Sequence, residues 1–439
     1  MASSAPSAEE QVPKIAGGEP SLGQRWYVLI LTMLVYTFSI ADRYVISTVL
    51  EPIRLEFHLN ETEASAFTGL ALGFFYVTMG LPMSWLADRY NRQKLLTFAV
   101  AAWSVMTTVC GYVTTPFQLM LARIGVGIGE AGGTPPCNTI IADYFPPSRR
   151  NMATSIFALG APIGAWLGSD LAGEVAKAHG WRASFLVLGL PGLILAAIIF
   201  FTMREPPRGR YDACTKEVAP SLGETARFMM KQRGGIHIAM GSAVSALWGW
   251  GLMWFTPAYI ERMYGLGEGN GGVILSPIHL LGGAGATLFT AWLLGRPEFG
   301  DQRRVMRLCA VVTALATIPS FYAYYTHSLP MMELMLWLYV PAIYFYLGPS
   351  FAGGQNAAPP RMRALWVSVT LLMANVFNLI VAPTFVGRLS DYFSGGQPTA
   401  ESLRLALLIL APTGFWAAFH YWRAERHLAA DQERIANHV

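Results

Sequence analysis

The chain has 439 residues, of which 53% are hydrophobic and only 13% are charged. Soluble domains carry about 25% charged residues, so a chain of this composition lacks the polar surface that two or three soluble domains would need. The net charge is only +4, and we expect the basic loops to serve membrane topology and anionic headgroups rather than nucleic acid.

The apolar residues fall into twelve runs of about 20 residues, the length that a helix needs to cross a hydrocarbon core about 30 Å thick. Because backbone groups in lipid must be satisfied within their own segment, these runs are predicted helices rather than strands. In chain order the predicted spans are residues 26–50, 64–87, 95–113, 117–141, 152–175, 183–203, 236–260, 271–294, 305–325, 331–353, 364–386 and 402–422. The sequence therefore predicts an all-α integral membrane protein.

A polar stretch at 204–235 divides the chain into six predicted spans on each side. It is predicted to be a cytoplasmic linker whose amphipathic segment SLGETARFMMKQR lies on the inner leaflet. An internal echo supports the division, since PPSRRNMATSIFALGAPIGAWLG begins at Pro146 and PPRMRALWVSVTLLMANVFNLIVAP begins at Pro359. We therefore expect two pseudo-symmetric six-helix bundles, with a disordered tail before them and a cytoplasmic tail after them. The expected boundaries are 1–24 for the first tail, 25–203 and 236–423 for the bundles, and 424–439 for the second tail.

The basic residues indicate how the helices are oriented. An even number of spans places both ends of the chain on one side, and most of the 31 Lys and Arg residues fall in the segments on that side. The other side keeps a short set, namely Arg54, Lys177, Arg182, Arg262, Arg388 and Arg404. The positive-inside rule then predicts that both termini are cytoplasmic in a protein of the cell or inner membrane.

Residues 127–132 read GIGEAG, a literal match to the G-x-G-x-x-G of dinucleotide-binding proteins. That fingerprint needs a preceding strand and a helix that opens at the glycines, so that free N–H groups meet the pyrophosphate. Here the glycines lie inside an apolar span, and we interpret them as small residues that let neighbouring helices approach closely. No cofactor is expected. The four cysteines are far apart and form no C-x-x-C, so neither a disulfide framework nor a metal site is indicated.

Four charged residues fall deep within the predicted spans: Asp42, Arg43, Arg123 and Glu130. A carboxylate near mid-membrane costs about 2.5–3.5 kcal/mol or more and usually faces a cavity with a partner. Asp42 lies about 24 Å outward along the first span, and Arg123 lies about 9 Å inward along the fourth. In a span of about 30–35 Å these two share one level, so they are predicted to pair. Glu130 lies near two full turns beyond Arg123, about 10 Å deeper on the same side of its helix.

We predict that Asp42 and Glu130 take up and release protons and that Arg43 and Arg123 tune them. The alternative is a purely structural ion pair, with Glu130 hydrogen-bonded to its neighbours. Buried ion pairs are poor stabilisers by themselves, which favours the functional interpretation. The second half offers no matching acid, so we expect coupling in the first half.

The loop SWLADRYNRQK at 84–94 resembles the G-x-L-x-D-R-x-G-R-K loop of the major facilitator superfamily. Ser84 and Asn91 replace the two glycines, and Asn tolerates the left-handed backbone that the second glycine supplies. The resemblance covers residues 25–423 and includes GWRASF after the fifth span. Within the superfamily, DRYNR, the run RIGVGIGEAGGTPPCNTIIADYF and REPPRG are similar to the Spinster group. Such proteins are associated with export of lysolipids and sphingosine phosphate.

The resemblance implies an inner gate. In such loops the Asp contacts the basic end and helix terminus of a neighbouring span, which assigns Asp88, Arg89 and Arg92 to gating. ADYFPPSRR looks like a second cytoplasmic latch. Its predicted residues are Asp143 and Arg150, with Arg363 as the repeat-mate. The alternative is that these arginines are only topology signals.

Aromatic residues are frequent in the seventh and tenth spans. Trp250 and Trp254 are four residues apart and share a face, so they are candidates to wall an apolar cavity. An aromatic wall opposite Arg43 and Arg123 suits an amphiphile with an anionic head and an apolar tail. The predicted cavity residues are Trp250, Trp254, Tyr36, Tyr346 and Asn375. The alternative for most aromatics is helix packing, and for the Asn an interhelical hydrogen bond.

We therefore predict a proton-linked secondary transporter that moves a lysolipid-like or other amphiphilic anion by alternating access. It is expected to act as a monomer whose partners are its substrate, protons and the bilayer. One alternative is a multidrug or organic-anion proton antiporter without lipid specificity, and another is a receptor or sensor. A lipid enzyme is disfavoured because the sequence has no G-x-S-x-G or H-E-x-x-H.

Overall fold

The computed structural model describes residues 19–211, 222–299, 301–359 and 362–436, and within these ranges it is helical and without strands. Most of the predicted tail at 1–24 lies outside the described residues, and α1 begins at Leu22. The helices of the N-terminal half are α1 (Leu22–Thr48), α2 (Leu50–Glu56), α3 (Glu61–Ser65), η1 (Ala66–Leu70), α4 (Ala71–Arg89), α5 (Arg92–Cys110), α6 (Pro116–Glu130), α7 (Thr134–Tyr144), α8 (Pro147–Ala158), α9 (Gly160–His179) and α10 (Trp181–Thr202).

The linker contributes the short helix α11 (Leu222–Lys231), which precedes the C-terminal half. The helices of that half are α12 (Arg233–Met253), α13 (Thr256–Tyr264), α14 (Asn270–Pro277), η2 (Ile278–Gly283), α15 (Ala284–Leu294), η3 (Pro297–Phe299), α16 (Gln302–Tyr325), α17 (Leu329–Phe345), α18 (Leu347–Asn356), α19 (Arg363–Asn375), η5 (Val376–Val381), α20 (Ala382–Ser394), α21 (Ala400–Leu410) and α22 (Thr413–Ala436).

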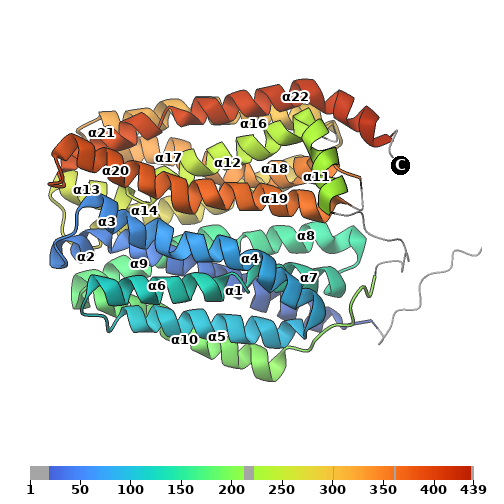
Figure 1. Ribbon diagram of the computed structural model, residues 1–439, viewed down its shortest axis with the longest axis horizontal. Helices are drawn as coiled ribbons and strands as arrows, with labels where there is room; N and C mark the ends of the chain where they lie inside the picture. Colours follow the sequence, from blue (N-terminus) through green and yellow to red (C-terminus); the bar gives the residue numbers. More distant parts are fainter. Residues whose placement is uncertain (1–18, 212–221, 300, 360–361, 437–439) are drawn as a thin grey trace, which may run out of the picture.

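The long helices run side by side, and the two halves lie next to one another with their loops at the two ends (Figure 1). Within the described residues, ten helical stretches are long and apolar enough to cross a membrane. The other two predicted spans are assembled from shorter helices: 64–87 from α3, η1 and α4, and 117–141 from α6 and α7. We call the end that carries α11 and the C-terminus the inner end, and the opposite end the outer end (Figure 1).

Several predicted spans are interrupted, which their hydrophobicity does not indicate. Among the interruptions are the π-helices η1, η2 and η5 and the turn between α6 and α7. Proline marks two of them, since Pro277 directly precedes η2 and Pro135 stands in the first turn of α7. All three of these π-helices pack against the other half: η1 and η5 contact each other, and η2 contacts α9. π-helical turns are frequent at functional sites, and here they lie where the halves meet.

The chain remains helical further toward the C-terminus than expected. Residues 424–436, predicted as part of a tail, continue α22 to Ala436. Asp431 is buried on this extension, and its Oδ2 accepts a hydrogen bond from the N–H of Gly235, 3.0 Å away, at the start of α12. The extension therefore packs against the C-terminal half and caps the start of α12.

The glycines of α6 allow close helix contacts, as the sequence predicts. A Cβ on Gly127 would lie 2.5 Å from the carbonyl oxygen of Leu72 on α4, and one on Gly129 would lie 2.8 Å from the backbone nitrogen of Trp103 on α5. Neither contact involves a flexible side-chain end that could move away. The fourth span therefore lies against its neighbours at backbone distance.

Replacing Gly127 by Ala is expected to lower the free energy of unfolding by about 1–3 kcal/mol, because the added methyl group meets a fixed carbonyl. Thermal unfolding of the purified protein in one detergent measures the effect. Gly80 on α4 is the matched control, since a Cβ there would have no neighbour within 4 Å. Gly80→Ala should leave the unfolding temperature unchanged or raise it. Equal behaviour of the two variants would contradict the close-packing interpretation.

Candidate functional site

Asp42 on α1 and Arg123 on α6 form a buried ion pair. Arg123 Nη1 lies 2.8 Å from Asp42 Oδ2, and the hydroxyl of Thr107 on α5 donates a hydrogen bond to Asp42 Oδ1. The exposed fractions of Arg123 and Asp42 are 0% and 3%. The contact predicted from residue depth is present, and α5 adds a third helix to it.

A second buried pair joins the next residue of α1 to the end of α6. Arg43 Nε and Nη2 each lie 2.7 Å from Glu130 Oε2. The guanidinium carbon of Arg43 also lies 4.4 Å from the ring centroid of Tyr76 on α4, a cation–π distance. Two adjacent side chains of α1 therefore bind two side chains of α6, one pair nearer the outer end than the other.

Parts of these charged groups have no partner. Within the described residues, Arg123 Nε, Arg123 Nη2 and Glu130 Oε1 are buried without a hydrogen bond to protein. Buried polar atoms are usually satisfied, so exceptions of this kind need an explanation such as water, ligand or a change of state. The cluster has spare donors for an anion and a spare carboxylate oxygen for a proton.

Aromatic side chains from the C-terminal half pack next to this cluster. Tyr44 of α1, which directly follows Arg43, lies edge to face with Trp250 at 6.2 Å and with the ring of His279 at 4.9 Å. Trp254 Nε1 donates to Asn378 Oδ1 at 2.8 Å. The ring of Trp254 also lies 5.4 Å from that of Tyr44, so the two predicted tryptophans face the same tyrosine. In this conformation they are packed in the contact between the halves.

The remaining predicted cavity residues lie in different surroundings. Tyr36 stacks on Phe157 with 4.9 Å between ring centroids, Tyr346 is buried, and Asn375 Nδ2 donates to the carbonyl of Leu371 in its own helix at 2.9 Å. An apolar groove of about 820 Å³ lies between α15, α16 and α17, and none of the predicted cavity residues lines it. Their role in binding substrate stays a prediction.

Three contacts of the charged cluster were not predicted from the sequence: the hydroxyl of Thr107, the ring of Tyr76 and the pairing of Arg43 with Glu130. Thr107 and Tyr76 belong to apolar spans in which polar and aromatic residues are common, so neither stands out. The backbone of Arg43 does not lie at the same depth as that of Glu130. The pair forms because the long arginine side chain extends to the depth of the Glu130 carboxylate.

Comparison with known families decides the class of protein. The model of the Major Facilitator Superfamily matches residues 32–382, which is well over half of the chain. The chain belongs to the major facilitator superfamily. It is accordingly an integral, multi-pass membrane transporter and not an enzyme.

The relatives of the chain narrow its place within the superfamily to the Spinster type. An MFS-type efflux pump of Mycolicibacterium smegmatis is 28% identical over 406 residues, 92% of this chain and 94% of that protein. Protein spinster homolog 1 of Xenopus laevis is 24% identical over 427 residues, 88% of this chain and 78% of that protein. A solved structure of a bacterial homolog of the human lysosomal transporter Spinster, inward-facing and unoccupied, has a TM-score of 0.80 at 28% identity. It covers 94% of this chain and 99% of that one. This chain is therefore a major facilitator transporter of the Spinster type.

The predicted inner-gate residues of this major facilitator transporter form contacts within the N-terminal half. Arg92 Nη1 lies 2.6 Å from Asp143 Oδ2, and Arg92 Nε lies 2.8 Å from Glu205 Oε1. Asp143 Oδ1 also accepts the N–H of Gly209 at 3.0 Å. The cluster ties α5, α7 and the segment after α10 together at the inner end. Its gating role stays a prediction.

Two other predicted gate residues, Arg89 and Arg150, make contacts outside the residues of this cluster. Arg89 is exposed, and its guanidinium lies 4.1 Å from the ring centroid of Trp85. Arg150 Nε donates to the carbonyls of Ala142 and Phe145 at 3.1 and 3.2 Å, at the end of α7. The side chains of Asp88 and Arg363 lie outside the described part of the structure.

Proposed function

We propose that this transporter is proton-linked and moves a lysolipid-like or other amphiphilic anion by alternating access. The observation that carries the proposal is the double ion pair between α1 and α6, Asp42–Arg123 and Arg43–Glu130, with both acids buried. Isolated charges in a membrane interior are costly, and buried pairs add little stability, so such a cluster is favoured by a function in transport.

The physical step is local. A proton on Asp42 or Glu130 removes the negative partner of an arginine and weakens the tie between α1 and α6. Glu130 is the last residue of α6, directly before the turn that leads into α7. Loss of its ion pair with Arg43 therefore allows the chain to bend at this turn. A change of one charge at Glu130 can therefore shift the balance between two arrangements of the α6–α7 segment.

The expected substrate follows from what the site can bind. Arg123 has two buried nitrogen atoms without a partner, which suits an anionic head group. The neighbouring Tyr44, Trp250 and Trp254 suit an apolar tail. The resemblance to the Spinster group, whose members are associated with export of lysolipids, supports a lipid-like substrate. The efflux-pump relative supports the second candidate, an antiporter of amphipathic drugs or organic anions.

Flux measurements in liposomes of purified protein, with and without an imposed pH gradient, test the proposal. We expect net flux of an anionic lysolipid to rise with the gradient and to fall when an ionophore dissipates it. A panel with a zwitterionic lysolipid, a lipid-free aromatic anion and a cationic amphiphile separates the two candidates. Gradient-dependent flux of the aromatic anion alone would favour the antiporter. Lysolipid flux that ignores the gradient would contradict proton linkage, and absence of any net flux would point to a receptor.

A further inference from the structure

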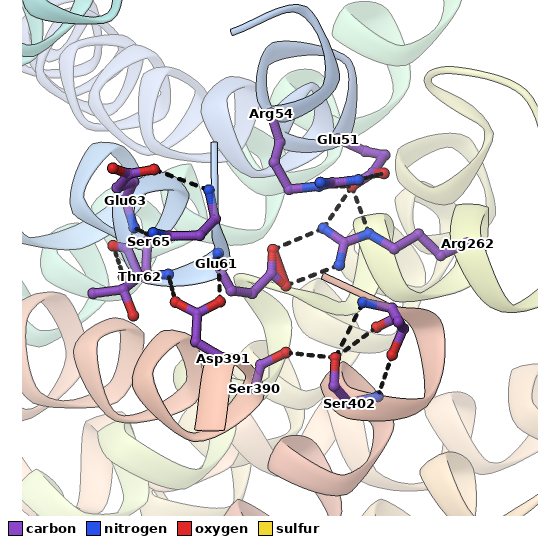
Figure 2. Close-up of polar contacts among 12 residues, drawn as sticks. Glu51, Arg54, Glu61, Thr62, Glu63, Ser65, Arg262, Ser390, Asp391 and Ser402 are labelled. Atoms are coloured by element: carbon purple, nitrogen blue, oxygen red, sulfur yellow. Dashed lines mark hydrogen bonds and ion pairs between the residues drawn. The ribbon is translucent and has the colours of Figure 1, made fainter. Parts of the chain in front are cut away.

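At the outer end, an arginine of the C-terminal half binds two carboxylates of the N-terminal half. Arg262 of α13 places Nε 2.5 Å from Glu51 Oε2, and its Nη1 and Nη2 lie 2.9 and 2.8 Å from the two carboxylate oxygens of Glu61 (Figure 2). The side chain of Glu61 is fully buried and that of Arg262 is 7% exposed. Paired N–H···O bonds of this kind are strong and directional.

The same segment is held from a second helix of the C-terminal half. The carboxylate of Asp391 on α20 accepts the N–H of Glu61 at 2.9 Å and the N–H of Thr62 at 2.8 Å (Figure 2). These are the first two N–H groups of α3, which lack partners inside the helix. The start of α3 is therefore bound twice from across the interface, at its side chain by Arg262 and at its backbone by Asp391.

A glycine lets α20 come this close. A Cβ on Gly387, one turn before Asp391, would lie 2.7 Å from Ser65 Oγ and 2.8 Å from the carbonyl oxygen of Glu61. Any other residue at 387 would push α20 away from α3 and lengthen the bonds of Asp391. The bonds of Asp391 therefore depend on the close approach of α20 that Gly387 allows.

The residues of this contact repeat a pattern found at the other end of the molecule. Residues 387–391 read GRLSD, and residues 84–88 read SWLAD, with a small residue, a Leu and an Asp at the same spacing. The first lies near the outer end of α20 and the second near the inner end of α4. The helices α3, η1 and α4 pack against η5, α20 and α19, so one helix pair carries the pattern once at each end.

We propose that Glu51, Glu61, Arg262, Gly387 and Asp391 form an outer latch that holds the transporter closed toward the outside and sets the balance between its two facing states. All of its bonds between these residues join one half to the other. Alternating access requires the halves to separate at this end, so the bonds must break in each cycle. The latch is independent of the proton linkage proposed above, because it needs no substrate and no gradient.

Arg54 gives Glu51 a partner that remains when the latch opens. Its Nη2 lies 2.7 Å from Glu51 Oε1 within the N-terminal half, so Glu51 keeps a partner when Arg262 leaves. Burial alone would raise the pKa of the Glu51 carboxyl, but the hydrogen bonds and charges of Arg54 and Arg262 outweigh it and leave that pKa below its ordinary value. The cost of opening therefore falls mainly on Glu61, whose carboxylate loses both of its arginine bonds.

Distance measurements between spin labels test the latch. Ala178 and Gln397 are exposed at the outer ends of the N-terminal and C-terminal halves, and cysteines there carry the labels in a Cys214→Ser background. In lipid nanodiscs without substrate, Arg262→Gln and Asp391→Asn should each raise the population with a long outer distance by about tenfold. The matched control is Arg404→Gln, because Arg404 bonds Glu401 three residues earlier in its own half, at 2.6 Å. It should leave the distances unchanged.

Thermal unfolding and size-exclusion profiles of each variant show whether it folds. If Arg262→Gln does not fold, Arg262→Lys keeps the charge and loses the paired geometry, so a smaller shift in the same direction is expected. Wild-type distances in Asp391→Asn together with either folded Arg262 variant would overturn the proposal. A shift of equal size in Arg404→Gln would overturn it as well, because the effect would then not belong to the bonds between the halves.

Discussion

Replacing Arg123 by Gln is expected to lower the free energy of unfolding by about 3–5 kcal/mol and to abolish transport. Asp42 would keep the hydroxyl of Thr107 but lose its charged partner, which leaves an uncompensated carboxylate in a fully buried place. Chemical unfolding in mixed micelles measures the first effect, and liposome flux measures the second.

The double variant Asp42→Asn with Arg123→Gln separates charge from packing. It removes both charges and keeps the shapes, so most of the lost stability should return while pH-dependent transport does not. A single Arg123→Gln protein as stable as the wild type would contradict the geometry of the pair. A double variant that transports with the wild-type pH profile would contradict its function.

Replacing Glu130 by Gln is expected to remove the pH dependence of transport. The amide has the shape of the acid and can still accept a hydrogen bond from Arg43, but it cannot take up or release a proton. Flux across a series of pH values should become flat where the wild-type flux varies, and an imposed pH gradient should no longer drive accumulation.

Glu174→Gln is the matched control for this experiment. Glu174 is an exposed carboxylate 3.0 Å from Lys177, far from the ion pairs in sequence and on the surface of α9. Its loss should leave the pH profile unchanged. If both Glu130→Gln and Asp42→Asn proteins keep the wild-type profile, proton linkage through this cluster is wrong.

The outer latch and the buried ion pairs lie on different helices and act on different contacts of the protein. The latch holds the halves together at the outer end, and the ion pairs hold α1 to α6 inside the N-terminal half. We expect latch variants to change the balance of facing states and ion-pair variants to change how that balance responds to pH. The two sets of variants are therefore distinguishable in one protein.

Much of the charged cluster could be predicted because depth along a membrane helix is simple to count. The rise per residue places Asp42 and Arg123 at one level, and the structure has them in contact. The Arg43–Glu130 pair was beyond this argument, since it depends on how a long side chain bends toward a neighbouring helix. The packed state of Trp250 and Trp254 depends on which face of α12 meets α1.

The partners in the outer latch were still harder to predict from the sequence than those in the charged cluster. Glu51, Glu61, Arg262 and Asp391 all fall in or near outer loops, where charged residues are ordinary and indicate nothing by themselves. Their sequence separations exceed 200 residues for Arg262 and 300 for Asp391. Only the docking of the two halves brings them together.

The sequence alone determined that the chain is a membrane protein with two six-helix halves, because lipid imposes length and hydrophobicity on each span separately. It also determined the level of the buried charges, since that depends on one helix at a time. The tertiary structure decided which side chains are partners, where the spans break into π-helices and how the outer end is closed. Those features depend on contacts between helices, and the energies that select among such contacts are not encoded in any one segment.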